Sequence, residues 1–212
     1  MILFLVFLIP LSLAIVLINY SRNGQAVTLP VMPFFQGMFM FIPSFLLLTI
    51  IHGVIEPSYS GAGFFFYTFF RDHAIMLLFS IGWLVLFRNS LLLNPREKIL
   101  YTLMAFLGGY YSMVNIHEYL TRITHLDIYA LFLLPVINLS LVILMALFLT
   151  HIVREYGLVR YISLVGLVSL PFAMTTISVL FFRNFPVPSI IGTVCLGAVA
   201  AILLFFRREA VV

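Results

Sequence analysis

Long apolar runs, separated by short polar segments, are the feature that most limits what this 212-residue chain can fold into. A helix needs about 20 apolar residues to cross the hydrocarbon core of a bilayer. The sequence is 64% hydrophobic and only 8% charged, which is far outside the range of soluble domains. Because lipid offers no hydrogen bonds to the backbone, runs of this length predict helices. We therefore predict an all-α, polytopic integral membrane protein.

The runs predict about seven transmembrane helices in a single bundle. Their expected bounds are 1–19, 28–52, 64–87, 99–117, 128–151, 158–182 and 187–206. The connecting segments are short and no repeat or domain linker is apparent, so residues 1–212 are predicted to form one transmembrane domain. The first run lacks the basic region and small-residue cleavage site of a secretory signal, which favours a retained helix.

The third apolar region allows two structures. Its aromatic segment, residues 64–70, is followed by Arg71, Asp72 and His73 and then by more apolar residues. Aromatic side chains favour the headgroup level, which supports an interfacial segment and a span that starts near His73. In the alternative, one helix covers 64–87 and places Arg71 about 10 Å along it. A charge at that depth demands a partner.

The distribution of lysine and arginine predicts the orientation. With seven spans, one side holds a cation-rich set: Arg22, Arg88, Arg96, Lys98, Arg154, Arg160, Arg207 and Arg208. The other side holds Arg71, Arg122 and Arg183. Because cytoplasmic loops retain cations, the amino terminus is predicted outside and the carboxyl terminus in the cytoplasm. The membrane is predicted to be a bacterial inner membrane or its equivalent. The net charge of +4 has the same origin, and no nucleic-acid partner is indicated.

Acids and histidines gather on the predicted outer face. The excess of lysine and arginine in cytoplasmic loops explains where cations lie, but it does not explain the placement of acids and histidines. They are His52, Glu56, Asp72, His73, His117, Glu118, His125 and Asp127. We interpret the outer face as the working surface and predict a shared polar pocket there.

Three kinds of site use these residues. The candidate catalytic groups are acids and bases: His117, Glu118, His125 and Asp127. The candidate substrate- or lipid-binding groups include two arginines that suit a phosphate: Arg71, Asp72, His73 and Arg122. The candidate metal ligands combine imidazole and carboxylate, which zinc favours: His52, Glu56, His73, His117 and His125.

Structural roles are the alternative for the same residues. A pair such as Glu118 and Arg122 at a helix end is usually solvated and contributes a few tenths of a kcal/mol. His52 and His73 also suit the membrane interface. His117 and Glu118 begin like the zincin helix motif, but Thr121 stands where that motif needs a second histidine.

Uncharged polar and small residues indicate helix packing. The polar set is predicted to form interhelical hydrogen bonds rather than a translocation path: Gln36, Asn115, Asn138, Thr175 and Thr176. On the last span, Gly197 and Ala201 mark a small-residue face that suits either its own bundle or another subunit. Pro135 and Pro171 fall inside expected helices, where they predict kinks.

No nucleophile motif and no Gly-rich phosphate loop is apparent, so any energy source would come from a partner. The first interpretation is a transporter component or the membrane subunit of a larger complex, with a polar pocket at the extracytoplasmic face. Its partners would be membrane lipids and other membrane subunits. The second is a membrane-embedded enzyme that acts on a lipid or membrane-linked substrate through the His/Glu/Asp cluster. The third is a structural scaffold subunit. The sequence decides neither whether the chain is an enzyme nor its cofactor, for which a metal ion is the candidate.

Overall fold

The computed structural model describes residues 31–54, 61–93, 95–121 and 133–209, and all regular secondary structure in these ranges is helical. The elements are α2 (Val31–Val54), α3 (Gly61–Phe69), the π-helical turn η1 (Phe70–Ala74), α4 (Ile75–Leu92), α5 (Arg96–Thr121), α6 (Leu134–Arg154), α7 (Leu158–Phe182) and α8 (Pro186–Glu209). Within the described part, α2, α5, α6, α7 and α8 are long and apolar enough to cross a membrane. The prediction of an all-α membrane bundle is confirmed. The expected span 1–19 lies outside the described residues, so the count of seven stays a prediction.

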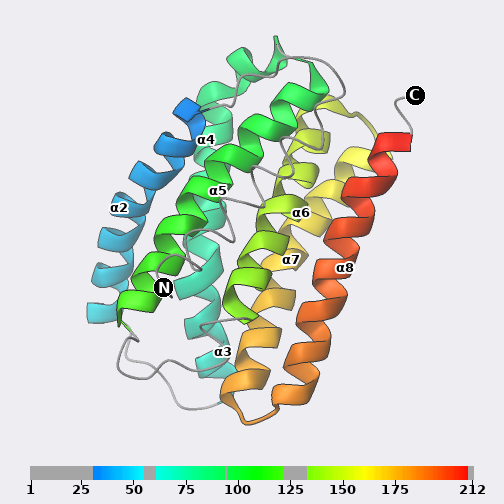
Figure 1. Cartoon of the computed structure of the whole chain (residues 1–212). Coiled ribbons are helices and arrows are strands. Elements are labelled where there is room, and N and C mark those ends of the chain that lie inside the picture. The colour runs from blue at the N-terminus through cyan, green and yellow to red at the C-terminus, as the bar shows by residue number, and fades with distance from the viewer. Residues whose placement is uncertain (1–30, 55–60, 94, 122–132, 210–212) are drawn as a thin grey trace.

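The helices run alternately in opposite directions, as Figure 1 shows. α2, α5 and α7 end at the lower end of the bundle in this view, where α3, α6 and α8 begin. We call these the lower and upper ends throughout. Arg88, Lys98 and Arg160 lie toward the upper end, and Arg183 follows α7 at the lower end. These four cations lie at the ends that the sequence implies, whereas the backbone of Arg71 lies in η1, inside the third helix. The membrane side of each end stays a prediction.

The third apolar region is helical without interruption from Gly61 to Leu92. Phe69 and Ile75, which flank the π turn, keep right-handed helical angles (φ −59°, ψ −49° and φ −64°, ψ −43°). This backbone corresponds to the single-helix alternative, not to a span that starts near His73. The helix begins at Gly61, three residues, or about one turn, before the expected start at residue 64.

The core lies between α5 and α6 and the helices around them. Of the α6 span, 67% is buried, against 11% of the α2 span. Figure 1 shows α5 between α2 and α6, with α7 and α8 beyond α6. The largest fully buried side chains include Phe106, Met145 and Met174. Since lipid tails are as apolar as these side chains, close packing and interhelical hydrogen bonds hold such a bundle together.

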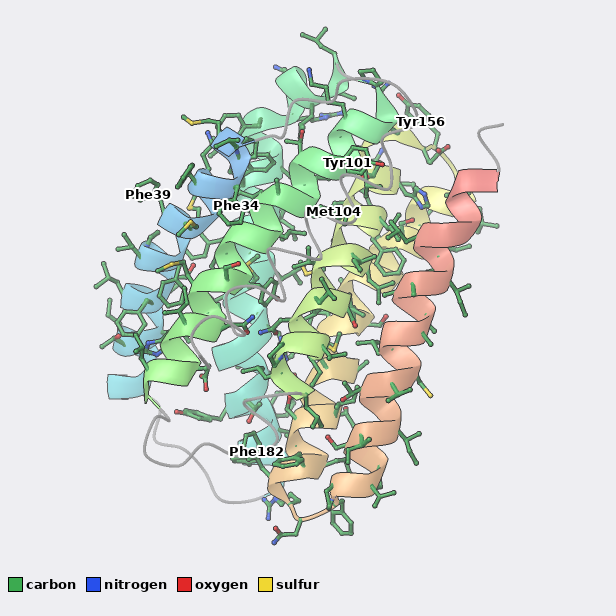
Figure 2. The ribbon with its side chains drawn as sticks, viewed as in Figure 1. Phe34, Phe39, Tyr101, Met104, Tyr156 and Phe182 are labelled. Carbon is green, nitrogen blue, oxygen red and sulfur yellow. The ribbon has the colours of Figure 1, made fainter. Side chains whose placement is uncertain are left out.

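Glycine sets the distance between α2 and α5. A Cβ added at Gly37 would collide with the main-chain carbonyl of Phe106, and one at Gly109 with the carbonyl of Phe34. Each helix therefore presses its backbone against the other where only glycine fits. Figure 2 shows Phe34 beside α5, whereas Phe39 points away from the bundle.

The small-residue face of α8 meets its own bundle. A Cβ at Gly197 would lie 3.7 Å from the side chains of Val136 and Ser140 on α6, which is ordinary contact. Gly192 faces Ile177 of α7. The sequence left open whether this face meets its own bundle or another subunit, and Gly192 and Gly197 both meet the bundle. In the described part of α6, Pro135 lies in the first turn, where its missing N–H removes no helical bond.

Candidate functional site

The π-helical turn η1 interrupts the regular hydrogen-bonding of the third helix well inside the bundle. Turns of this type are rare and often occur at functional sites. Within it, His73 is 4% exposed. Counted from Gly61 at about 1.5 Å per residue, His73 lies about 18 Å along the helix. An ionisable side chain is thus buried several turns inside a continuous helix.

A second irregular turn lies beside the first. The ring of Phe69, which precedes η1, stacks on the ring of Phe172 at 4.4 Å and 22°, and η1 contacts α7. Phe172 follows Pro171, whose missing N–H leaves the carbonyl of Leu167 without its helical donor. We call η1, together with Phe69, Pro171 and Phe172, the π–proline junction.

Buried polar side chains accompany the junction in the lower half of the bundle. They come from six elements: Thr68, His73, Asn115, Asn138, Ser140, Thr175, Ser178, Ser189 and Thr193. The side-chain amide of Asn138 donates to Asn115 Oδ1 at 2.6 Å and joins α6 to α5. The hydroxyl of Ser189 donates to the carbonyl of Ile177 at 2.9 Å and joins α8 to α7. Burial of so many hydroxyl and amide groups gives this half a polar interior.

The predicted interhelical hydrogen bonds are confirmed for three of five residues. Besides the Asn115–Asn138 bond, Trp83 Nε1 donates to Gln36 Oε1 at 3.1 Å and joins α4 to α2. Thr175 and Thr176 instead donate to carbonyls of their own helix, Pro171 at 2.8 Å and Phe172 at 2.9 Å. For these two the prediction was wrong, because a hydroxyl in a helix readily bonds four residues back.

His117 packs against two aromatic rings of α2 that also contact each other. Its ring centroid lies 4.8 Å from Phe45 and 5.9 Å from Phe41. Asn115, two residues earlier, faces α6 instead, as expected for positions about 200° apart on a helix. Glu118 follows on α5 and is half-buried. At the lower end, the guanidinium of Arg183 lies 5.6 Å from the ring of Phe64, which links the end of α7 to α3.

The predicted site residues fall into three groups. His73, His117 and Glu118 have described side chains. His52 lies in the last turn of α2 and Arg71 and Asp72 lie in η1, with backbones alone described. Glu56, Arg122, His125 and Asp127 lie outside the described residues.

The two predicted outer-face histidines with described side chains belong to elements with different neighbours. His117 contacts α2, whereas His73 belongs to η1, which contacts α7. In the described part of the chain, no three His, Cys, Asp or Glu residues are arranged to hold a metal ion. The shared outer pocket and the metal site both stay predictions, since the side chains of His52, Glu56, Asp72, His125 and Asp127 are not described.

Two features of the site were missed from the sequence. The π turn gives no pattern of its own, although the polar triplet Arg71, Asp72 and His73 inside an apolar run marks its position. The Gly37–Gly109 contact joins single glycines on separate helices and has no local motif. No protein-family model, curated protein or solved structure matches this chain, so its function is argued from its own residues and geometry.

Proposed function

We propose that this membrane protein is a component of a transport system or the membrane subunit of a larger complex, with a polar pocket toward the extracytoplasmic face. The working part of that pocket is the π–proline junction. The observation that carries the proposal is the buried His73 inside a π turn, several turns from the start of the third helix.

An ionisable residue at such depth supports a role beyond packing. Charged and ionisable side chains are costly in the membrane interior and commonly mark ion paths or proton relays. An apolar residue at position 73 would fill the same space without that cost. The imidazole instead lies in the half of the bundle that already buries hydroxyl and amide groups.

The backbone at the junction supports binding of a small polar or ionic group. A π turn and a proline both alter the regular series of main-chain hydrogen bonds along a helix, so main-chain carbonyls become available to a ligand. His73 adds an imidazole, whose ring nitrogens can donate and accept hydrogen bonds. Together these groups suit a proton, an ion or a small solute better than a large substrate.

The test compares His73→Gln with His151→Gln in cells that lack the native protein. His151 is half-buried on α6 toward the upper end, with Nδ1 3.5 Å from the hydroxyl of Ser163. Both changes keep a polar side chain of similar size, and membrane levels are matched by immunoblot. We expect His73→Gln to reproduce the solute profile of the deletion strain by mass spectrometry, and His151→Gln to restore the native profile.

A native profile with His73→Gln would contradict the role of the junction. The subunit role is tested separately by native mass spectrometry after mild solubilisation. Other membrane subunits should accompany the protein, whereas a lone monomer with turnover on a lipid would favour the enzyme interpretation.

A further inference from the structure

Along one side of α5, between its contacts with two neighbouring helices, runs a strip of partly accessible residues. It consists of Tyr101, Ala105, Gly108, Ser112 and Ile116, all half-buried. They recur every three or four residues and therefore share one side of the helix. We call them the outer strip of α5.

The outer strip lies between two helix contacts. Gly109 meets the backbone of α2, and Asn115 bonds to Asn138 of α6. At about 100° per residue, the strip occupies the sector of α5 between these two contacts. Figure 1 shows the same arrangement, with α2 and α6 on either side of α5 and no other described helix in front of it.

The middle of the strip suits a close apolar neighbour. A Cβ added at Gly108 would meet no atom within 4 Å, and Ala105 is almost as small. The hydroxyl of Ser112 donates to the carbonyl of Gly108 at 2.7 Å, so it needs no partner outside the helix. Small residues without unmet hydrogen bonds are the surface on which membrane helices approach most closely.

We propose that residues 1–19 of this chain pack along the outer strip as a helix antiparallel to α2 and α5. The segment is apolar almost throughout. As a helix it measures about 28 Å, against about 22 Å between Tyr101 and Ile116 at the same rise per residue. A helix of this length covers the whole strip.

The connection to α2 fits this position. The described structure begins at Val31, and α2 itself borders the strip. Residues 20–30 span at most about 36 Å when extended, so the segment reaches the strip from the start of α2. Consecutive elements usually lie side by side, and the polar connection with Arg22 then stays at the cation-rich upper end.

Disulfide cross-linking in native membranes tests the proposal. Cys195, the sole cysteine, is changed to alanine, and Ala105→Cys is combined in turn with Ser12→Cys, Leu13→Cys, Ala14→Cys and Ile15→Cys. Four successive positions sample every side of a helix, and a disulfide requires Cα atoms about 4.4–6.8 Å apart. We expect an intramolecular disulfide at one or two of the four positions, seen as a mobility shift of the monomer that reductant reverses.

The matched control replaces Ala105→Cys with Val165→Cys. Val165 is 69% exposed on α7 and lies at a similar distance from the upper end. It should yield several-fold less cross-linked monomer with each of the four partners. Equal yields with Val165→Cys, or none with Ala105→Cys in folded protein, would overturn the proposal.

The other occupants give distinct results. A dimer band from Ala105→Cys alone would assign the strip to a second copy of the chain. A strip covered only by lipid would leave Ala105→Cys unlinked and open to a lipid-soluble maleimide. Gly108→Cys serves as a second anchor if Ala105→Cys does not fold, and the same outcomes decide the proposal there.

Discussion

Gly37 of α2 and Gly109 of α5 make reciprocal contacts, each lying against the main chain of the other helix. Gly37 meets the carbonyl of Phe106, which lies three residues before Gly109. Gly109 in turn meets the carbonyl of Phe34, which lies three residues before Gly37. Neither helix can therefore gain a Cβ at this level without moving away from the other.

Alanine at either glycine should destabilise the protein. Gly37→Ala and Gly109→Ala force backbone shifts, and overpacking of this kind costs about 1–3 kcal/mol. Gly82→Ala is the control, because a Cβ at Gly82 meets nothing within 4 Å. Thermal unfolding in detergent, followed by tryptophan fluorescence, should show lower midpoints for the first two variants alone. Equal midpoints for all three would mean that α2 and α5 separate without cost.

The bond between Trp83 and Gln36 makes the single tryptophan a reporter of α2. Gln36→Leu removes the acceptor and leaves a buried indole N–H unpaired, which costs about 1–3 kcal/mol. We expect a lower unfolding midpoint and a shifted emission maximum for Trp83. Gln36→Glu keeps an acceptor and should preserve more of the native emission; a larger change than with leucine would contradict the bond.

Asn115 and Asn138 should behave as a coupled pair. Either single change to leucine leaves the other amide buried, whereas the double change removes both groups. Coupling between membrane hydrogen-bond partners averages about 0.6 kcal/mol, with a maximum near 1.7. A double-mutant cycle in detergent measures it, with Asn115→Leu combined with Thr150→Val as the distant pair. Additive effects for the two asparagines would show that their bond contributes nothing net.

His117 should act through its ring. Contacts between aromatic rings contribute about 0.5–1.5 kcal/mol beyond burial, so His117→Ala is expected to lower the unfolding midpoint. His117→Phe keeps a ring against Phe41 and Phe45 and should retain most of the stability. The reverse order would assign the role of His117 to its nitrogen atoms and support it as an acid–base candidate.

The length of the apolar runs was enough to predict the helices, because crossing lipid leaves the backbone few alternatives. Helix rotation was not predictable in the same way. Both faces of α2 are apolar, and only small side chains decide that Gly37 meets α5 while Phe39 points outward. Similarly, His73 and His117 were recognised as site candidates, but their different neighbouring helices depend on rotation that the apolar pattern leaves undetermined.

Pro171 should separate stability from function. Pro171→Ala returns an N–H to α7, so we expect an unchanged or higher unfolding midpoint together with the solute profile of the deletion strain. Pro43→Ala changes the proline inside α2, away from the junction, and should leave the native profile intact. A fully active Pro171→Ala protein would leave His73 as the sole support for the site.

The π turn holds one residue more than an α-helical turn requires. That surplus can move along the chain, because a neighbouring turn can widen as this one narrows. Each such step exchanges one hydrogen-bond pattern for another and keeps their number constant. When the extra residue moves by one position, the residue that it passes rotates by about 100° relative to the rest of the helix. The extra residue of the third helix lies at the level of the buried His73. A shift of that extra residue along the chain therefore rotates residues beside this imidazole.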